Sequence, residues 1–128
     1  MTADAGARLQ SVLAELRRLP GILGVTIARR DGILIAHSLP KAMDPKKIAA
    51  MAAAIVGTSE MATIQLAQGR FVRAIVESDH GKLLSLGAGE EALLVALVYD
   101  DANLGLVLMA LERAAKQVER ILQDAGNG

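Results

Sequence analysis

The sequence contains no cysteine and no tryptophan, and it has little aromatic character of any kind. Its only aromatic side chains are Phe71 and Tyr99. Without cysteine the chain forms no disulfide and offers neither a thiolate nucleophile nor a cysteine ligand for zinc, which is compatible with a reducing cytosol. Because modules for single-stranded nucleic acids commonly stack bases on aromatic rings, the shortage of aromatics argues against such a module.

The chain also lacks an excess of charge of either sign. Lys and Arg together number 14, as do Asp and Glu, so there is no overall positive field to attract phosphate backbones or anionic lipids. The amino-terminal residues have no basic segment followed by an apolar one, and the apolar run at residues 48–57 is about half of what crosses a bilayer. We therefore expect a soluble, cytoplasmic protein that binds neither nucleic acid nor membrane.

No arrangement of residues typical of catalysis or metal binding stands out. The stretch LGAGEE departs from the G-x-G-x-x-G pattern, and the P-loop motif is absent. His37 and His80 lie far apart and outside the spacings of metal ligands. Asp100 and Asp101 could act in acid–base chemistry or hold Mg²⁺, but acids before a predicted helix more often favour its positive N-terminus. We predict no catalytic residue, no metal site and no cofactor, and we do not expect an enzyme.

The spacing of apolar residues alternates between helical and strand periods along the chain. Residues 9–16 show helical spacing, and Pro20 follows as a stop signal. Asp44 and Pro45 together predict the start of a second helix, since Asp caps free amides and proline loses nothing at the first helical position. Asn103 is expected to cap a third helix. The predicted strands are residues 22–28, 33–36, 71–78, 82–88 and 92–99.

The connections and the apolar runs predict how these elements assemble. Asp31-Gly32 favours a tight turn, so the first two strands are expected to form a hairpin. The run ALLVALVY at residues 92–99 is apolar on both sides, which is typical of a strand in the middle of a sheet with both faces covered. We therefore predict a single α/β (α+β) domain over residues 1–128, built on a five-stranded antiparallel sheet between helices.

The second helix, predicted over residues 45–68, is apolar on more sides than contact with one sheet requires. No charged residue occurs between Lys47 and Glu60, although a solvated helix face would carry charges. The residues predicted to face the sheet are Ile48, Met51, Ile55, Ala62 and Leu66. The residues of the neighbouring apolar face are Ala49, Ala50, Ala53, Ala54, Gly57, Met61 and Ile64.

This second apolar face must be buried against something other than the sheet. Either the first or third helix covers it, or a partner chain does. The small residues Ala49, Ala53 and Gly57 are spaced by four, so they would form a ridge against which another helix could pack closely. We favour a partner chain, most simply an identical one in two-fold symmetry.

Several weak signals recur in a fixed order along the chain. The stretches are LPGILGVTIARRDGILIA, DPKKIAAMAAAIVGTSEMA and RFVRAIVESDHGKLLSLGAGEEALLVALV. They contain Pro20-Gly21, Asp31-Gly32, an alanine-rich helix and a late Leu-Leu-Val strand. In order and spacing, over about residues 8–124, the chain resembles the roadblock family, which is also named for dynein light chain 7.

The resemblance implies a fold and a mode of assembly. The five-stranded antiparallel sheet would be sandwiched between the central helix on one face and the N- and C-terminal helices on the other. Family members commonly form homodimers or heterodimers by pairing their central helices and third strands, here residues 45–68 and 71–78. The residues thereby expected in a dimer interface are Ala50, Ala53, Ala54, Gly57, Thr58, Met61, Ile64, Phe71, Arg73 and Ile75.

The resemblance also implies a function. Roadblock proteins typically serve as platforms for small Ras-like GTPases or as subunits of motor complexes, and some bacterial members activate GTP hydrolysis on a polarity GTPase. We therefore expect a non-catalytic homodimeric scaffold or regulator of such a GTPase, with Arg29, Arg30 and Arg70 as candidate partner contacts. The alternatives are a subunit of a heteromeric roadblock or motor complex, and a sensor domain that encloses an apolar small molecule.

Overall fold

A computed structural model describes residues 4–127 of the chain. It contains three helices and five strands in the order that the sequence predicts. The elements are α1 (Ala5–Arg17), β1 (Ile22–Arg29), β2 (Leu34–Ser38), α2 (Pro45–Gln65), β3 (Arg73–Ser78), β4 (Gly81–Ala88), β5 (Ala92–Val98) and α3 (Leu104–Asn127).

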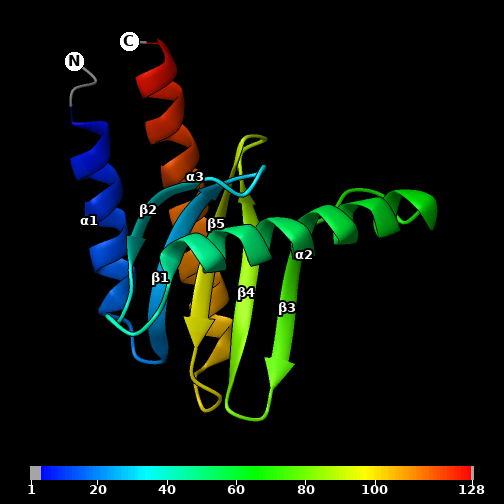
Figure 1. Cartoon of the computed structure of the whole chain (residues 1–128), viewed down its shortest axis with the longest axis horizontal. Helices are drawn as coiled ribbons and strands as arrows, with labels where there is room; N and C mark the ends of the chain where they lie inside the picture. Colours follow the sequence, from blue (N-terminus) through cyan, green and yellow to red (C-terminus); the bar gives the residue numbers. More distant parts are fainter. Residues whose placement is uncertain (1–3, 128) are drawn as a thin grey trace.

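The strands form one antiparallel sheet in the order β2-β1-β5-β4-β3. The run that is apolar on both sides, β5, is the central strand, as predicted. In Figure 1, α2 crosses one face of the sheet, while α1 and α3 lie side by side on the other. The α+β sandwich expected from the sequence is confirmed.

Successive residues of β5 build two separate apolar cores, one on each face of the sheet. Leu94 belongs to the larger core, together with Leu13 of α1 and Leu111 of α3. Leu93 and Val95 point the other way, into a smaller core beneath α2. The buried α2 side chains of that smaller core are Ile48, Ala52 and Val56.

The predicted helix caps and the hairpin turn are present. The Asp44 carboxylate accepts hydrogen bonds from the backbone N–H groups of Lys46 and Lys47 at the start of α2. Asn103 Oδ1 likewise accepts from the Leu106 N–H at the start of α3. Gly32 sits in the β1–β2 turn with φ +94°, a conformation that favours glycine. These local signals therefore act as expected.

Several predicted boundaries are wrong, among them the end of the second strand, which lies at Ser38 and not at residue 36. The second helix ends at Gln65 instead of residue 68, because Ala67 adopts a left-handed φ of 54° and the Gln68 N–H donates to the Thr63 carbonyl at 2.9 Å. This is the usual way to close a helix end, but alanine occupies the position that glycine commonly takes, so nothing in the sequence marks it. The third strand begins at Arg73, not at residue 71.

The prediction of which α2 residues face the sheet is only partly right. Ile48 is buried and Ile55 is half-buried, but Met51 and Leu66 are 46% and 66% exposed, and Ala62 is exposed as well. The sheet ends at β3 before α2 does (Figure 1), so the C-terminal half of the helix leaves the sheet behind. The rotation and placement of α2 are set by packing, which its periodicity alone does not reveal.

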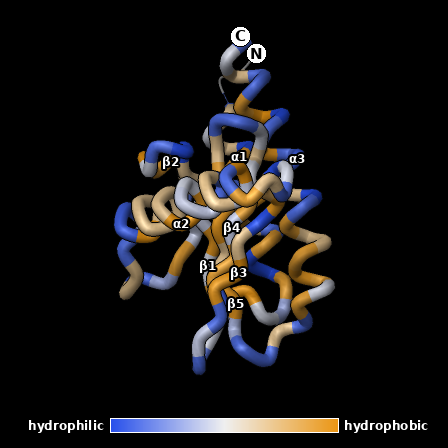
Figure 2. Tube along the Cα trace, turned by 90° about the vertical axis from the view of Figure 1, so that its right-hand side faces the viewer, coloured by the Kyte–Doolittle hydropathy of each residue, from blue (hydrophilic) through white to orange (hydrophobic). Residues whose placement is uncertain are grey.

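By length and composition, α2 could cross a membrane: an 18-residue window reaches a mean hydropathy of 1.3, and 22% of that window is buried in the fold. A single helix of this kind is weak evidence for a membrane segment, because core helices of soluble proteins have the same composition. Figure 2 shows α3 alternating between hydrophobic and hydrophilic residues, whereas much of α2 is weakly hydrophobic. The apolar character of α2 is therefore what distinguishes it from α3.

Candidate interaction surface

The C-terminal half of α2 overhangs the edge of the sheet (Figure 1). Met61, Ile64 and Leu66 on this half are 60%, 74% and 66% exposed. Soluble monomers rarely expose a large contiguous apolar patch, and such a patch commonly marks a site of protein interaction. The overhanging half of α2 is therefore the first part of a candidate interaction surface.

The edge strand β3 and the residue before it supply the second part. Val72 is 65% exposed, Val76 is 44% exposed and Ile75 is 37% exposed. Because β3 is the last strand of the sheet, one side of its backbone has no neighbouring strand among residues 4–127. We name the exposed apolar residues together the α2–β3 surface: Met61, Ile64, Leu66, Val72, Ile75 and Val76.

The two faces of β3 contribute differently to this surface. Val76 pairs with Leu83, whose side chain lies in the core on the α2 side. Ile75 pairs with Leu84, which belongs to the core on the α1–α3 side. Arg73 shares that second face, and its guanidinium lies 3.9 Å from the Glu112 carboxylate of α3. The surface therefore wraps around the edge of the sheet.

Most residues predicted for a dimer interface lie where a partner could reach them. Ala53 and Phe71 are exceptions, since both are half-buried and pack against the core beneath α2. Arg73 is half-buried as well. The exposed members of the predicted set are Ala50, Ala54, Gly57, Thr58, Met61, Ile64 and Ile75.

The predicted ridge of small residues along α2 is not free for a partner helix. Ala49 is fully buried, and Ala53 is half-buried beneath the β1–β2 turn. A Cβ placed on Gly32 of that turn would lie 3.6 Å from the Ala53 Cβ. Only Gly57 of the three is exposed, so the prediction of a continuous ridge open to a partner helix is wrong.

Three exposed apolar residues of the surface were missed by the sequence analysis. Leu66 was assigned to the sheet-facing side, while Val72 and Val76 were not singled out. Val76 alternates with its neighbours as any strand residue does. Its exposure depends on β3 being an edge strand, and no local pattern in the sequence carries that information.

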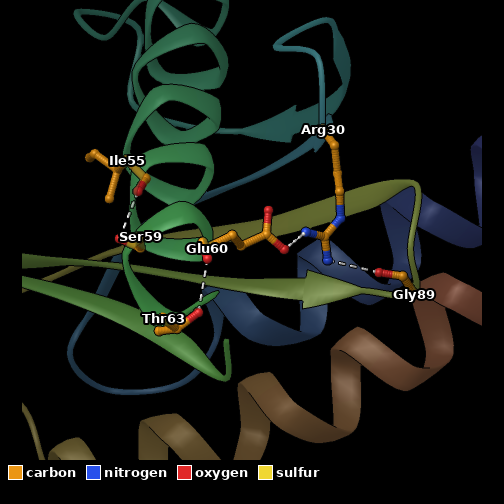
Figure 3. A network of polar contacts seen from close by, with 6 residues as sticks. All are labelled: Arg30, Ile55, Ser59, Glu60, Thr63 and Gly89. Atoms are coloured by element: carbon orange, nitrogen blue, oxygen red, sulfur yellow. Dashed lines mark hydrogen bonds and ion pairs between the residues drawn. The ribbon is translucent and has the colours of Figure 1, made fainter. Parts of the chain in front are cut away.

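An ion-pair network fastens α2 near the point where its overhang begins (Figure 3). Arg30 Nη1 lies 2.5 Å from the Glu60 carboxylate, and Arg30 Nη2 donates to the Gly89 carbonyl at 3.1 Å. The Arg30 side chain is 28% exposed, so this pair is partly shielded from solvent. The network thus connects the β1–β2 turn, α2 and the β4–β5 turn.

The three arginines predicted as partner contacts are in different situations. Arg30 is engaged within the chain by the network just described, which makes it a poor candidate for contacting a partner. Arg29 pairs with Asp31 at 2.7 Å, and its side chain remains 59% exposed. Arg70 is exposed in the segment between α2 and β3. Arg29 and Arg70 therefore remain accessible.

A hollow of about 1150 Å³ lies between the overhang of α2 and the C-terminal part of α3. Its lining includes Arg30, Glu60, Arg70 and Glu119 beside a few apolar residues. Charged walls do not suit the apolar ligand of the sensor alternative. Within residues 4–127, no group of three or more His, Asp or Glu side chains is arranged to hold a metal ion.

Comparison with known proteins shows which family has this architecture. The family model for the Roadblock/LC7 domain matches residues 8–98. The uncharacterized proteins MJ1340 and MJ0310 of Methanocaldococcus jannaschii are each 35% identical over 111 residues, which covers 87% of this chain and 96% of each relative.

Solved structures agree with the sequence comparison. The gliding protein MglB of Thermus thermophilus superposes with a TM-score of 0.87 at 27% identity, covering 94% of this chain and 93% of that one. A Roadblock/LC7 domain of Streptomyces avermitilis has a TM-score of 0.81 at 21% identity, covering 88% of this chain and 96% of the other, which is a likeness of fold.

Proposed function

This chain belongs to the Roadblock/LC7 family, and on that premise we propose that it is a cytoplasmic, non-catalytic homodimer that scaffolds or regulates a small Ras-like GTPase. The observation that carries the proposal is the exposed α2–β3 surface. Its apolar side chains lie beside an unpaired strand edge, which is a combination suited to association with another chain.

Two copies related by a two-fold axis would use both parts of this surface at once. Pairing the β3 edges would continue the sheet from one copy into the other. Each overhanging α2 would then extend over the neighbouring copy, where Met61 and Ile64 could be buried. The small residues Ala54 and Gly57 would let the two helices approach closely, because neither side chain holds the backbones apart.

The family supports a GTPase as the further partner. Roadblock proteins typically serve as platforms for small Ras-like GTPases. Such a GTPase has switch segments whose conformation depends on the bound nucleotide. A rigid dimer could bind and order those segments, while the GTPase itself positions the nucleotide and Mg²⁺. Arg29 and Arg70 are accessible for contacts of this kind. Arg30 is already engaged with Glu60 and Gly89.

The first test is the solution mass by light scattering across a dilution series. A homodimer gives about twice the 13.4 kDa of the chain, and the mass should persist on dilution. A monomer at micromolar concentration contradicts the homodimer and favours the heteromeric alternative, in which another roadblock chain covers the α2–β3 surface.

The second test is binding to small Ras-like GTPases of the same organism, purified and loaded with GDP or with a non-hydrolysable GTP analogue. We expect binding that depends on the nucleotide, measured by calorimetry. Equal binding to both forms would indicate a localising scaffold. Absence of binding to any such GTPase contradicts the regulatory proposal while leaving the dimer intact. A multiple-turnover GTP hydrolysis assay with the same proteins then separates stimulation of hydrolysis from scaffolding.

A further inference from the structure

The backbone of β3 offers its outward hydrogen-bonding groups at alternate residues. The turn between β3 and β4 contains two residues, Asp79 and His80, between the paired residues Ser78 and Gly81. In a two-residue hairpin, the pair that flanks the turn directs its N–H and C=O groups toward each other, and this direction alternates along the strand. The β3 residues whose N–H and C=O groups point outward are therefore Arg73, Ile75 and Glu77.

The same three residues also share one face of the sheet. Their pairing partners on β4 are Leu86, Leu84 and Lys82, of which the two leucines lie in the core on the α1–α3 side. The outward edge thus presents an apolar side chain flanked by a positive and a negative one at equal spacing. This arrangement is complementary to its own copy turned through 180°.

We propose that two copies of this chain pair their β3 edges antiparallel about a two-fold axis at Ile75, with Arg73 of each copy opposite Glu77 of the other. The inference rests on the homodimer proposed above and adds its register and charge pairing. In this arrangement the outward N–H and C=O groups of Arg73, Ile75 and Glu77 all find backbone partners. Ile75 meets its own copy, and an Arg73–Glu77 pair forms on each side.

Neighbouring registers match the side chains less well. An axis at Ala74 places Ile75 opposite Arg73, and an axis at Val76 places Ile75 opposite Glu77. An axis at Arg73 or at Glu77 would bring identical charges face to face, which is destabilising in an antiparallel pair. The axis at Ile75 alone among these pairs apolar with apolar and each charge with its opposite.

Both charged residues have capacity for a new partner. The ion pair that Arg73 makes within the chain is long, at 3.9 Å, and its side chain is 33% exposed. Glu77 is exposed and makes no ion pair among residues 4–127. Its neighbour on β4, Lys82, instead donates to the Asp100 carbonyl at 3.3 Å. An Arg73–Glu77 pair between copies would therefore displace no short ion pair.

A single-cysteine scan tests the register directly, because the natural chain has no cysteine. Only the residue on the axis faces its own copy at a separation that a disulfide can span, with Cα atoms about 5.5 Å apart. We expect Ile75→Cys to form a disulfide-linked dimer under mild oxidation about tenfold faster than Ala74→Cys or Val76→Cys. Faster crosslinking of either neighbour overturns the axis at Ile75 and identifies the alternative register.

Charge exchange provides a second test with its own control. Arg73→Glu and Glu77→Arg each place like charges opposite one another, so each variant should raise the dimer Kd about tenfold. When the two variants are mixed, opposite charges meet again, and native mass spectrometry should show the mixed dimer in excess over either homodimer. Each variant keeps its own substitution in the mixture. Recovered dimer formation must therefore come from the restored pairing of opposite charges, and not from a change in the fold of one chain.

The outcomes separate this inference from the proposed function. A natural chain that is monomeric by light scattering overturns both the homodimer and its register. A natural chain that is dimeric, but whose two charge variants mix only statistically, overturns the Arg73–Glu77 pairing and leaves the homodimer standing. Preferential mixed dimers together with Ile75→Cys crosslinking establish the register.

Discussion

The two edges of the sheet differ in what lies beside them. At the β2 edge, α1 runs alongside the strand (Figure 1), Gln10 Nε2 donates to the His37 carbonyl at 3.5 Å, and Arg17 Nη1 donates to Ser38 Oγ at 3.0 Å. At the β3 edge, the last four residues of the strand are exposed, and α2 passes over the edge without closing it.

This difference bears on how the protein can assemble. A sheet with two open edges can add strands at both sides and grow into an open-ended chain of molecules. With one edge occupied by α1 side chains, pairing is directed to β3, and two copies complete a closed assembly. The asymmetry of the edges therefore favours a dimer over a filament.

The largest expected effect comes from placing a charge on the overhanging helix. Gly57→Glu should raise the dimer Kd about a hundredfold, because an unpaired carboxylate buried between chains costs about 3 kcal/mol or more. A Cβ at Gly57 meets nothing within 4 Å among the residues that the structure describes, so the fold should tolerate the change. The measurement is light scattering on dilution.

The matched control for that variant is Ala14→Glu, at an exposed position of α1 away from the β3 edge. It should leave the dimer intact. If Gly57→Glu stays dimeric at low micromolar concentration, α2 does not lie in the interface.

The next prediction compares the two edges by placing a proline on each of them in turn. Ile75→Pro removes an N–H that points away from β4, so the strand can remain in the sheet while pairing between copies is lost. We expect the dimer Kd to rise about tenfold or more. His37→Pro makes the same change on the β2 edge, where it should not alter the mass. An equal effect of both variants would show that the edges do not differ in assembly.

A smaller effect is expected where the overhang is fastened. Arg30→Met breaks the links to Glu60 and Gly89, and we expect about 1–2 kcal/mol of lost folding stability, since Glu60 loses its partner at a half-shielded site. Urea denaturation measures this loss. Glu60→Gln, which can still accept a hydrogen bond from Arg30, should lose less. If Arg30→Met is as stable as the natural chain, the network does not hold α2 in place.

The smallest effect concerns two buried hydroxyl groups beneath α2, one toward each edge. Thr26 on β1 and Ser85 on β4 both pair with Val95, and neither hydroxyl has a hydrogen-bond partner among residues 4–127. Burying a hydroxyl without a partner is unfavourable, so Thr26→Val and Ser85→Ala should each change stability by less than about 1 kcal/mol, in the stabilising direction. Calorimetric Tm values check this, and a clear loss in either variant would reveal a hydrogen bond to that hydroxyl.

Local patterns in the sequence predicted much of the fold. The Asp44 and Asn103 caps, the turn at Gly32 and the fully apolar β5 each depend on neighbouring residues, so they could be read directly. The candidate surface was predicted less well. The prediction of which α2 residues face the sheet was only partly right, and Val76 was not predicted to be exposed. Exposure depends on which elements pack nearby.

The Arg30 network could not be predicted from the sequence. Its members Arg30, Glu60 and Gly89 come from three segments separated by about thirty residues each, and no spacing rule connects them. Arg30 is one of the predicted candidates for contacting a partner, whereas the fold directs its side chain toward Glu60 of α2 and the Gly89 carbonyl.

The sequence by itself determined the order of helices and strands, the central position of β5 and the apolar character of α2. These properties follow from hydrophobic periodicity and turn chemistry, which act over a few residues. Only the tertiary structure decided that β3 is an open edge, that α1 closes the β2 edge and that α2 projects beyond the sheet. Strand order and helix placement arise from packing between distant segments, and that packing creates the surface on which the proposed function depends.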